Sequence, residues 1–240
     1  MRLIIKTEVE EILGEILANI PDQLFSKDKN WFIDSSVSPK PYFLAILGYL
    51  RGRIESPTIV IFNSTGYYEK SGEPREAFSF TEGFEKYMWI PNLWGRPDPR
   101  LRWTYFFLLG FEGDRSYGTF DRFEPDYVKA LISKPGYRPN YPEEVERRNH
   151  QFLQEACPEI IYADAADAVE AWIKIDQCLE KARRETNVCI VPLGTKPHAI
   201  GGCLSSLTDG SPGVLYLMPR TFKVRDVPRG DYIWKYVLTL

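Results

Sequence analysis

The sequence predicts an α/β fold in which helices cover both faces of a mostly parallel central sheet. Nearly continuous apolar runs, typical of strands that are buried on both faces, occupy residues 31–36, 58–65, 103–110, 159–164 and 187–194. Segments with helical periodicity separate these runs, and alternating strands and helices indicate βαβ units. The predicted architecture is therefore a Rossmann-like three-layer sandwich.

Each predicted helix between the strands has its own signals. Segment 39–52 opens on a proline, which suits a first helical turn, and reaches a glycine at its end. Segment 142–157 also opens on a proline, and its pattern is amphipathic. In segment 165–185 the apolar residues fall on one face, and Asp164 is the predicted N-cap.

The chain is predicted to be a single domain over residues 1–240, with long inserts after the second and third strands. The inserts are near 66–102 and 111–141, where aromatic, glycine and proline residues follow no clean period. One short helix is expected near 125–133. Connections of this length are usually lids, small subdomains or contact surfaces. Two further strands are expected at 213–219 and 231–240, and the second fits an edge or antiparallel position.

Composition excludes several classes of protein. A hydrophobic content of 44% in 240 residues supports a large core, and a net charge of −3 argues against whole-surface binding to nucleic acid or acidic membranes. No apolar run reaches the roughly 18 residues of a membrane span. Residues 9–20 fit an amphipathic helix rather than a secretion signal. The four cysteines form no C-x-x-C pair, so we expect small core residues with free thiols in a reducing compartment, no metal, no cofactor and a cytoplasmic location.

The predicted ligand site lies where the strands end. Ligands of open parallel sheets bind outside the carboxyl ends of the strands. Four of the five strand ends carry hydroxyl or glycine residues and three add a cation, a combination that suits a phosphate-bearing small molecule or nucleotide. The predicted binding residues are Ser35, Ser36, Lys40, Thr65, Gly66, Arg115, Ser116, Gly194, Thr195, Lys196 and His198.

Each of these turns also has an ordinary structural explanation. The serines after the first strand suit capping of the next helix, and residues 65–66 suit a plain turn. An internal ion pair would account for Glu112 and Arg115. Lys196 is the least ordinary, because the helix dipole disfavours a cation in a first turn. His198 fits a base, a phosphate partner or a residue that covers the crevice.

Aromatic residues offer a second kind of contact, and familiar catalytic motifs are missing. Tyr67, Tyr68, Trp89 and Trp94 are candidates for stacking on a base, although core packing explains them as well. The sequence has no G-x-G-x-x-G, Walker A, G-x-S-x-G or H-E-x-x-H motif. The sequence therefore lacks the defining motifs of dinucleotide dehydrogenases, P-loop nucleotidases, α/β-hydrolases and zincins.

Segment 187–202, NVCIVPLGTKPHAIGG, resembles a region of the CRISPR-associated Rossmann-fold (CARF) sensor domains, where a strand runs into a Gly-Thr-Lys turn before a helix. CARF domains and the related SAVED domains of antiphage signalling bind cyclic oligonucleotides at strand ends. The similarity covers about a dozen residues, and the Asp34-Ser35-Ser36 turn is loosely comparable with the family's first strand end. This chain has Pro192-Leu193 where the family has an extra glycine.

Three functions follow from these observations. The resemblance and the turns favour a nucleotide- or phosphate-binding sensor or assembly subunit of a prokaryotic antiphage-type defence system, acting as a homodimer or with a partner effector protein. An alternative is a nucleotide-processing hydrolase that cleaves a phosphodiester or N-glycosidic bond, with Glu112 or Asp34 as acid or base and His198 assisting. A further alternative is a pure protein-interaction subunit. The sequence does not decide whether the chain is an enzyme.

Overall fold

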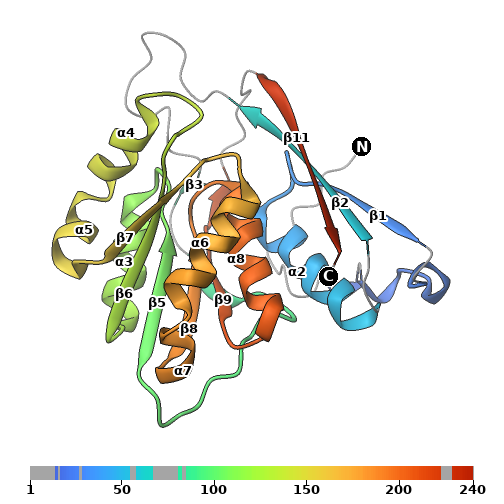
Figure 1. The fold of residues 1–240 in the computed structure, drawn as a ribbon, viewed down its shortest axis with the longest axis horizontal. Coiled ribbons are helices and arrows are strands. Elements are labelled where there is room, and N and C mark those ends of the chain that lie inside the picture. The colour runs from blue at the N-terminus through green and yellow to red at the C-terminus, as the bar shows by residue number, and fades with distance from the viewer. Residues whose placement is uncertain are drawn as a thin grey trace.

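The computed structural model describes residues 14–15, 17–26, 29–54, 58–66, 81–82, 85–222 and 229–239. Of the helix predicted over residues 9–20, residues 14–15 and 17–20 are described, and residues 14–15 and 17–18 are helical. The other elements (Figure 1) are, in chain order, the 3₁₀ helix η1 (Asp22–Leu24), β1 (Asn30–Asp34), α2 (Lys40–Arg53), β2 (Thr58–Gly66), β3 (Thr81–Glu82), β4 (Lys86–Trp89), β5 (Trp103–Leu108), α3 (Gly113–Phe123), β6 (Tyr127–Ser133), α4 (Tyr141–Arg148), α5 (His150–Ala156), β7 (Glu159–Ala163), α6 (Ala168–Leu179), α7 (Ala182–Glu185), β8 (Asn187–Pro192), α8 (Lys196–Asp209), β9 (Gly213–Met218), β10 (Thr221–Phe222) and β11 (Arg229–Thr239).

The larger sheet has six strands in the order β4-β9-β8-β5-β6-β7. All neighbouring pairs are parallel except β4 and β9, so the prediction of an α/β fold with mostly parallel strands is confirmed. The five parallel strands follow the order of a doubly wound sheet, in which the first strand along the chain lies at the centre. Here that strand is β5, and the strand order reverses between β5 and β8.

The first two predicted strands do not belong to this sheet. β1 pairs in parallel with β2, and β2 pairs with β11 in antiparallel orientation, which forms a separate three-stranded sheet. The expectation that the runs 31–36 and 58–65 belong to the central sheet was therefore wrong. Apolar periodicity shows which face of a strand is buried, but the partner of β2 comes from the far end of the chain, and a pattern within one strand does not show it.

The region 111–141 also differs from expectation. Residues 125–133 were predicted to include a short helix, but residues 127–133 form β6, which pairs in parallel with both β5 and β7. Tertiary pairing on both sides outweighs the weak helical pattern of this stretch. Much of the other predicted insert, near 66–102, lies outside the described residues. Its described part includes β4 and the two-residue strand β3, which pairs with β10.

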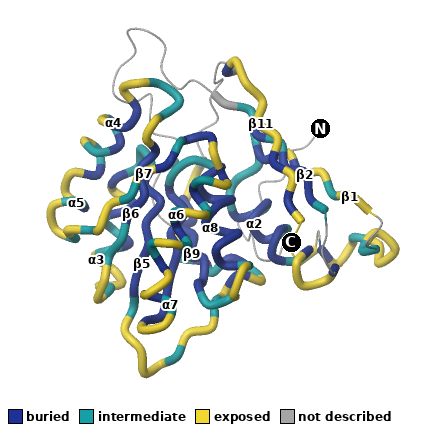
Figure 2. Tube along the Cα trace, viewed as in Figure 1, coloured by how far each residue is buried: buried dark blue, intermediate teal, exposed yellow. Residues whose placement is uncertain are grey.

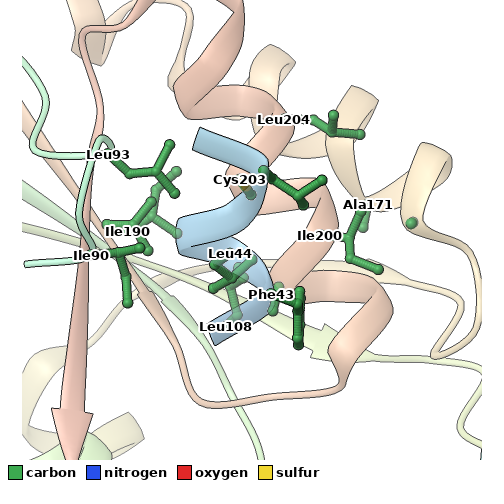
Figure 3. Packing of buried hydrophobic residues seen from close by; sticks show 14 of the residues in the cluster. Phe43, Leu44, Ile90, Leu93, Leu108, Ala171, Ile190, Ile200, Cys203 and Leu204 are labelled. Carbon is green, nitrogen blue, oxygen red and sulfur yellow. The ribbon is translucent and has the colours of Figure 1, made fainter. Parts of the chain in front are cut away.

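Helices cover both faces of the six-stranded sheet. Figure 1 shows α4 and α5 on its outer side and α2 between it and the three-stranded sheet. Phe106 and Leu108 of β5 point into the core cluster shared with α2 and α8, whereas Tyr105 and Phe107 join the cluster on the opposite face. In Figure 3, residue Leu44 of α2 lies among core side chains from both the sheet and α8. Burial therefore concentrates in the central strands and α8 (Figure 2).

Helix boundaries refine two predictions. The N-cap of α6 is Asp167, which accepts hydrogen bonds from the backbone amides of residues 169 and 170, so the prediction of Asp164 was wrong by one turn. Asp164 instead accepts from the amide of Ala166 at 2.8 Å. The predicted helix over 142–157 is divided at Asn149 into α4 and α5.

The four cysteines differ in burial. The four cysteines are free thiols, but Cys157 is exposed and Cys178 half-buried, so only Cys189 and Cys203 are core residues. Over the ranges described above, no helix has the length and apolar character needed to cross a bilayer. Within the same ranges, no group of three acidic, cysteine or histidine side chains is placed to hold a metal ion.

Glycine is required where the turns after β5 and β8 meet. A Cβ atom on Gly110 would lie 2.4 Å from the carbonyl oxygen of Leu193, so Gly110→Ala forces the two turns apart. We expect this change to lower the free energy of unfolding by about 1–3 kcal/mol, measured by urea denaturation. The matched control is Gly118→Ala in α3, where a Cβ meets nothing within 4 Å. The control is expected to be neutral or stabilising by about 0.5–1 kcal/mol, and equal stability of the two variants would contradict the prediction.

Candidate functional site

A cavity of about 420 Å³ lies where the strand order of the larger sheet reverses. In doubly wound sheets this reversal leaves a crevice, because the connections after the two central strands turn to opposite faces. Here α3 packs on one face and α8 on the other. The cavity also receives the carboxyl ends of β1 and β2 from the smaller sheet. Its lining includes residues 36–40, 63–64, 109–112, 133, 136–137 and 193–196.

Among the described residues that line this cavity, three are cations, and each belongs to the first turn of a different helix. Lys40 begins α2, Arg115 lies in the first turn of α3, and Lys196 begins α8. The positive end of each helix dipole disfavours a cation at this position. Three cations in unfavourable helix positions therefore lie around one cavity, and one of them, Arg115, is paired with Glu112.

Backbone carbonyl groups hold the two lysine side chains in place. Lys40 Nζ donates to the carbonyl oxygen of Leu193 at 3.1 Å. Lys196 Nζ donates to the carbonyl oxygen of Ser36, which ties α8 to the turn after β1. Because the acceptors are neutral, these bonds orient the cations without cancelling their charge.

Burial makes both lysines easier to deprotonate, and nearby cations add to this effect at Lys40. Burial lowers the pKa of Lys40 to about 7, and the charges of Arg115 and Lys196 add to this effect while Glu112 opposes it. Burial likewise lowers the pKa of Lys196 to about 8, against the attraction of Asp34. Both side chains keep some accessible surface because they face the cavity.

Arg115 is the most deeply buried of the three cations, with 8% of its surface exposed. Its Nη1 donates to Glu112 Oε2 at 2.7 Å, its Nη2 donates to the carbonyl oxygen of Leu217, and its guanidinium lies 5.5 Å from the centre of the Tyr216 ring. Its Nε has no hydrogen-bond partner among the described residues. Within the described part of the chain, Arg115 therefore has one buried N–H group without a partner.

Glu112 is ionised, and its carboxylate accepts hydrogen bonds from neighbouring side chains. Burial alone would raise the pKa of Glu112, but the charge of Arg115 and hydrogen bonds from Thr81 and Arg115 outweigh it, so the net pKa is lowered. Thr81 Oγ1 donates to Glu112 Oε1, which ties the strand β3 to the cavity wall. The internal ion pair anticipated for Glu112 and Arg115 is thus present, and both residues still line the cavity.

Two turns that each contain a glycine bring backbone groups close to the cavity. A Cβ atom on Gly194 would lie 2.7 Å from the carbonyl oxygen of Leu109, the counterpart of the close contact at Gly110. Thr195 follows as the N-cap of α8, and its Oγ1 accepts from the amide of His198 at 3.3 Å. Glycine turns that lead into helix N-termini are common sites for phosphate groups.

Aromatic residues form another part of the wall. Phe111, Tyr137 and Tyr141 line the cavity, and the rings of Phe111 and Tyr141 meet edge to face with their centres 5.2 Å apart. An aromatic wall near a cationic one suits a ligand that has both a planar ring and an anionic group.

Three predicted residues are buried next to the cavity without lining it. The hydroxyl of Ser35 donates to the backbone of Phe62 at 3.0 Å, which joins β1 to β2. The hydroxyl of Ser116 donates to Asn149 Oδ1 at 2.7 Å, which joins α3 to the α4–α5 break. His198 is fully buried behind Ser133. These residues support the site from behind.

The remaining predicted residues lie elsewhere. Asp34 is exposed, and its Oδ1 accepts a hydrogen bond from the backbone amide of Ser36 at 2.8 Å. Residues 65–66 continue β2 instead of forming a turn. Trp89 packs against Trp103, and Trp94 is 60% exposed. Two further candidates, Tyr67 and Tyr68, lie outside the described residues.

The structure adds cavity residues that the sequence analysis missed, chiefly Ser133, Tyr137 and Tyr141. All three follow or end β6, the strand that was mistaken for a helix. Had the run YVKALIS been interpreted as a strand, Ser133 would have been a strand-end hydroxyl like the others. The available signal was its β-branched and aromatic content.

Comparison with protein-family models finds no match, and comparison with curated proteins finds none either. The arrangement of the cavity itself therefore carries the information about function. That arrangement brings together six of the predicted binding residues, namely Ser36, Lys40, Arg115, Gly194, Thr195 and Lys196.

Replacing Lys40 with methionine tests the electrostatic cost of the site. A lysine whose pKa is lowered on folding destabilises the folded state below that pKa, and the penalty disappears as pH rises toward the pKa of the unfolded state. We therefore expect Lys40→Met to raise the free energy of unfolding by about 0.5–2 kcal/mol at pH 6, with a smaller gain at pH 9. The exposed Lys235→Met is the control, and denaturant titrations at both pH values provide the measurement. A gain that does not shrink with rising pH would contradict the electrostatic origin.

Proposed function

We propose that this chain is a ligand-binding sensor or assembly subunit with a Rossmann-like fold, and that the cavity between β5 and β8 binds a phosphate-bearing nucleotide. The observation that carries the proposal is the convergence of Lys40, Arg115 and Lys196, from three helix starts, on one cavity. The resemblance of the Gly194-Thr195-Lys196 turn to CARF domains supports a role in prokaryotic antiphage-type defence.

The charges favour an anion as the ligand. Among the described lining residues, the charged groups are three cations and the carboxylate of Glu112, which leaves an excess of positive charge when both lysines are protonated. The dipoles of α2, α3 and α8 add to this field. A phosphate at the turns containing Gly110 and Gly194 would meet backbone amides and lysine ammonium groups together.

The size and lining of the cavity favour a nucleotide over a bare phosphate. A volume of about 420 Å³ lies in the lower part of the range of small-ligand pockets. It leaves room for a ring beside the phosphate, next to Phe111, Tyr137 and Tyr141. A cyclic oligonucleotide contains several such units, so one cavity would hold one unit and the rest would contact a second copy or an effector protein.

The carboxylates suggested for the alternative hydrolase suit it less well. Glu112 is ionised and engaged by Arg115 and Thr81, so it is not available as a general acid near neutral pH. Asp34 is exposed, and its lowered pKa comes mainly from hydrogen bonds with Ser36. Binding is therefore the better-supported function of these residues.

Calorimetric titration tests the proposal directly. The panel contains inorganic phosphate, AMP, ADP, GMP, cyclic di-AMP and cyclic tetra-adenylate. We expect at least one nucleotide to bind more tightly than phosphate, and Lys196→Ala to weaken it at least tenfold, about 1.4 kcal/mol. The control is Lys174→Ala, which removes a lysine of α6 paired with Glu170. If the whole panel fails to bind, or if Lys196→Ala binds normally, the proposed site is wrong.

The affinity should also depend on pH. An anion that binds to Lys40 and Lys196 raises their pKa values, so binding takes up protons where the free protein has partly lost them. Since those pKa values are about 7 and 8 in the unliganded protein, the affinity is expected to fall as pH rises from 7 to 9. Titrations in buffers of different ionisation enthalpy measure the proton uptake. An affinity that is constant across this range would show that neither lysine contacts the anion.

A further inference from the structure

A serine and a histidine meet at the wall of the cavity. Ser133 is the last residue of β6 and lines the cavity, and its Oγ lies 3.4 Å from Nδ1 of the fully buried His198. This separation is long for a hydrogen bond, as is common for catalytic pairs without a bound ligand. No motif in the sequence suggests the pair, because the two residues are 65 positions apart.

The hydrogen bonds of His198 determine its tautomer. Nε2 lies 2.9 Å from the carbonyl oxygen of Asp164, and a carbonyl oxygen can only accept. Nε2 therefore carries the proton, and the lone pair of Nδ1 faces Ser133. The hydroxyl of Ser133 donates to this lone pair, and the carbonyl group of Asp164 fixes the orientation of the ring. A nucleophile, a base and a group that orients the base are thus connected by successive hydrogen bonds.

The electrostatic environment keeps the imidazole neutral. Burial lowers the pKa of His198 to about 4, and the positive charge of Lys40 lowers it further, while hydrogen bonds with the backbone of Asp164 and Ala163 and the negative charge of Glu170 act in the opposite direction. An unprotonated imidazole can accept a proton. A ligand anion that neutralised Lys40 would remove one of the causes of its low basicity, so that ligand binding would strengthen the base.

The position of the pair separates it from the phosphate-binding turns. β6 is the neighbour of β5 in the sheet, and adjacent strands lie about 4.8 Å apart. A phosphate at Gly110 and Gly194 would therefore be offset from Ser133 by about one strand. The group that Ser133 can attack is then a neighbouring atom of the ligand and not the anchored phosphorus.

From this geometry we infer that Ser133 and His198 are a nucleophile–base pair that hydrolyses a carboxylic ester of a phosphate-bearing alcohol, such as an acylated nucleotide. The inference relies on the proposed function for the phosphate anchor and adds a reaction to it.

The reaction has two steps. Ser133 Oγ attacks the acyl carbon and its proton moves to His198 Nδ1. The bond from the acyl carbon to the alcohol oxygen then breaks, and the alcohol leaves with that proton. In the second step, water gives a proton to His198 and attacks the acyl-serine, and Ser133 regains the proton as the carboxylic acid is released. No oxidant, reductant or metal enters the balance.

The experiment combines covalent labelling with turnover on the full chain. A fluorophosphonate probe forms a bond from serine oxygen to phosphorus as fluoride leaves, and peptide mass spectrometry identifies the labelled residue. We expect labelling at Ser133, none in Ser133→Ala, and at least tenfold slower labelling in His198→Gln. The control is Ser38→Ala, whose hydroxyl also lines the cavity but contacts the carbonyl oxygen of Pro39. Hydrolysis of 3′-O-acetyl-AMP to AMP and acetate should be lost in Ser133→Ala, slowed in His198→Gln and retained in Ser38→Ala.

Phosphate and AMP titrations on the same variants separate this inference from the proposed function. If Ser133→Ala binds AMP normally while labelling and turnover are lost, both proposals are supported. If the wild-type protein binds AMP but Ser133 is not labelled, or if His198→Gln is labelled at the wild-type rate, the catalytic inference is wrong and the binding proposal stands. If no ligand of the calorimetric panel binds but Ser133 is labelled and the acetyl ester is hydrolysed, the binding proposal is wrong and the nucleophile–base assignment of Ser133 and His198 stands. Thermal unfolding of each variant verifies that it is folded.

Discussion

The parallel pairing of β5 with β8 is the constraint on which the rest of the structure depends. Leu108 lies opposite Pro192, so both strands end at the same level of the sheet. The following turns then come so close that neither Gly110 nor Gly194 has room for a side chain. Beyond them the chain continues into α3 on one face and α8 on the other. The cavity is the space that this divergence leaves open.

The charges at this opening lower the stability of the folded chain and would favour the proposed binding of an anion. Three helices begin at the cavity, and each places a cation where its own dipole disfavours one. Protein atoms surround the two lysines, and the fall in their pKa values indicates how strongly the folded chain resists protonation there. A bound anion would relieve this unfavourable field. The unliganded protein thus holds electrostatic strain that a ligand can reduce, which suits a protein that responds to ligand binding.

His198 links this charged opening to the rest of the larger sheet. It belongs to α8, and its ring contacts the ends of β6 and β7 through Ser133 and Asp164. These strand ends are therefore held in fixed positions relative to the helix that contains Lys196. The same contacts orient the imidazole toward a hydroxyl in the cavity wall. A residue that supports the fold can in this way also be placed for chemistry.

The sequence alone determined the α/β class, seven strands close to their observed bounds, and six residues that meet in the cavity, because apolar runs and strand-end turns are local features. It missed β6, and with it Ser133 and the aromatic wall, because pairing on both sides outweighs local preference. Only the tertiary structure separated β1 and β2 into their own sheet and brought His198 to Ser133. Those decisions depend on which strands pair across long stretches of chain, and no local pattern contains that information.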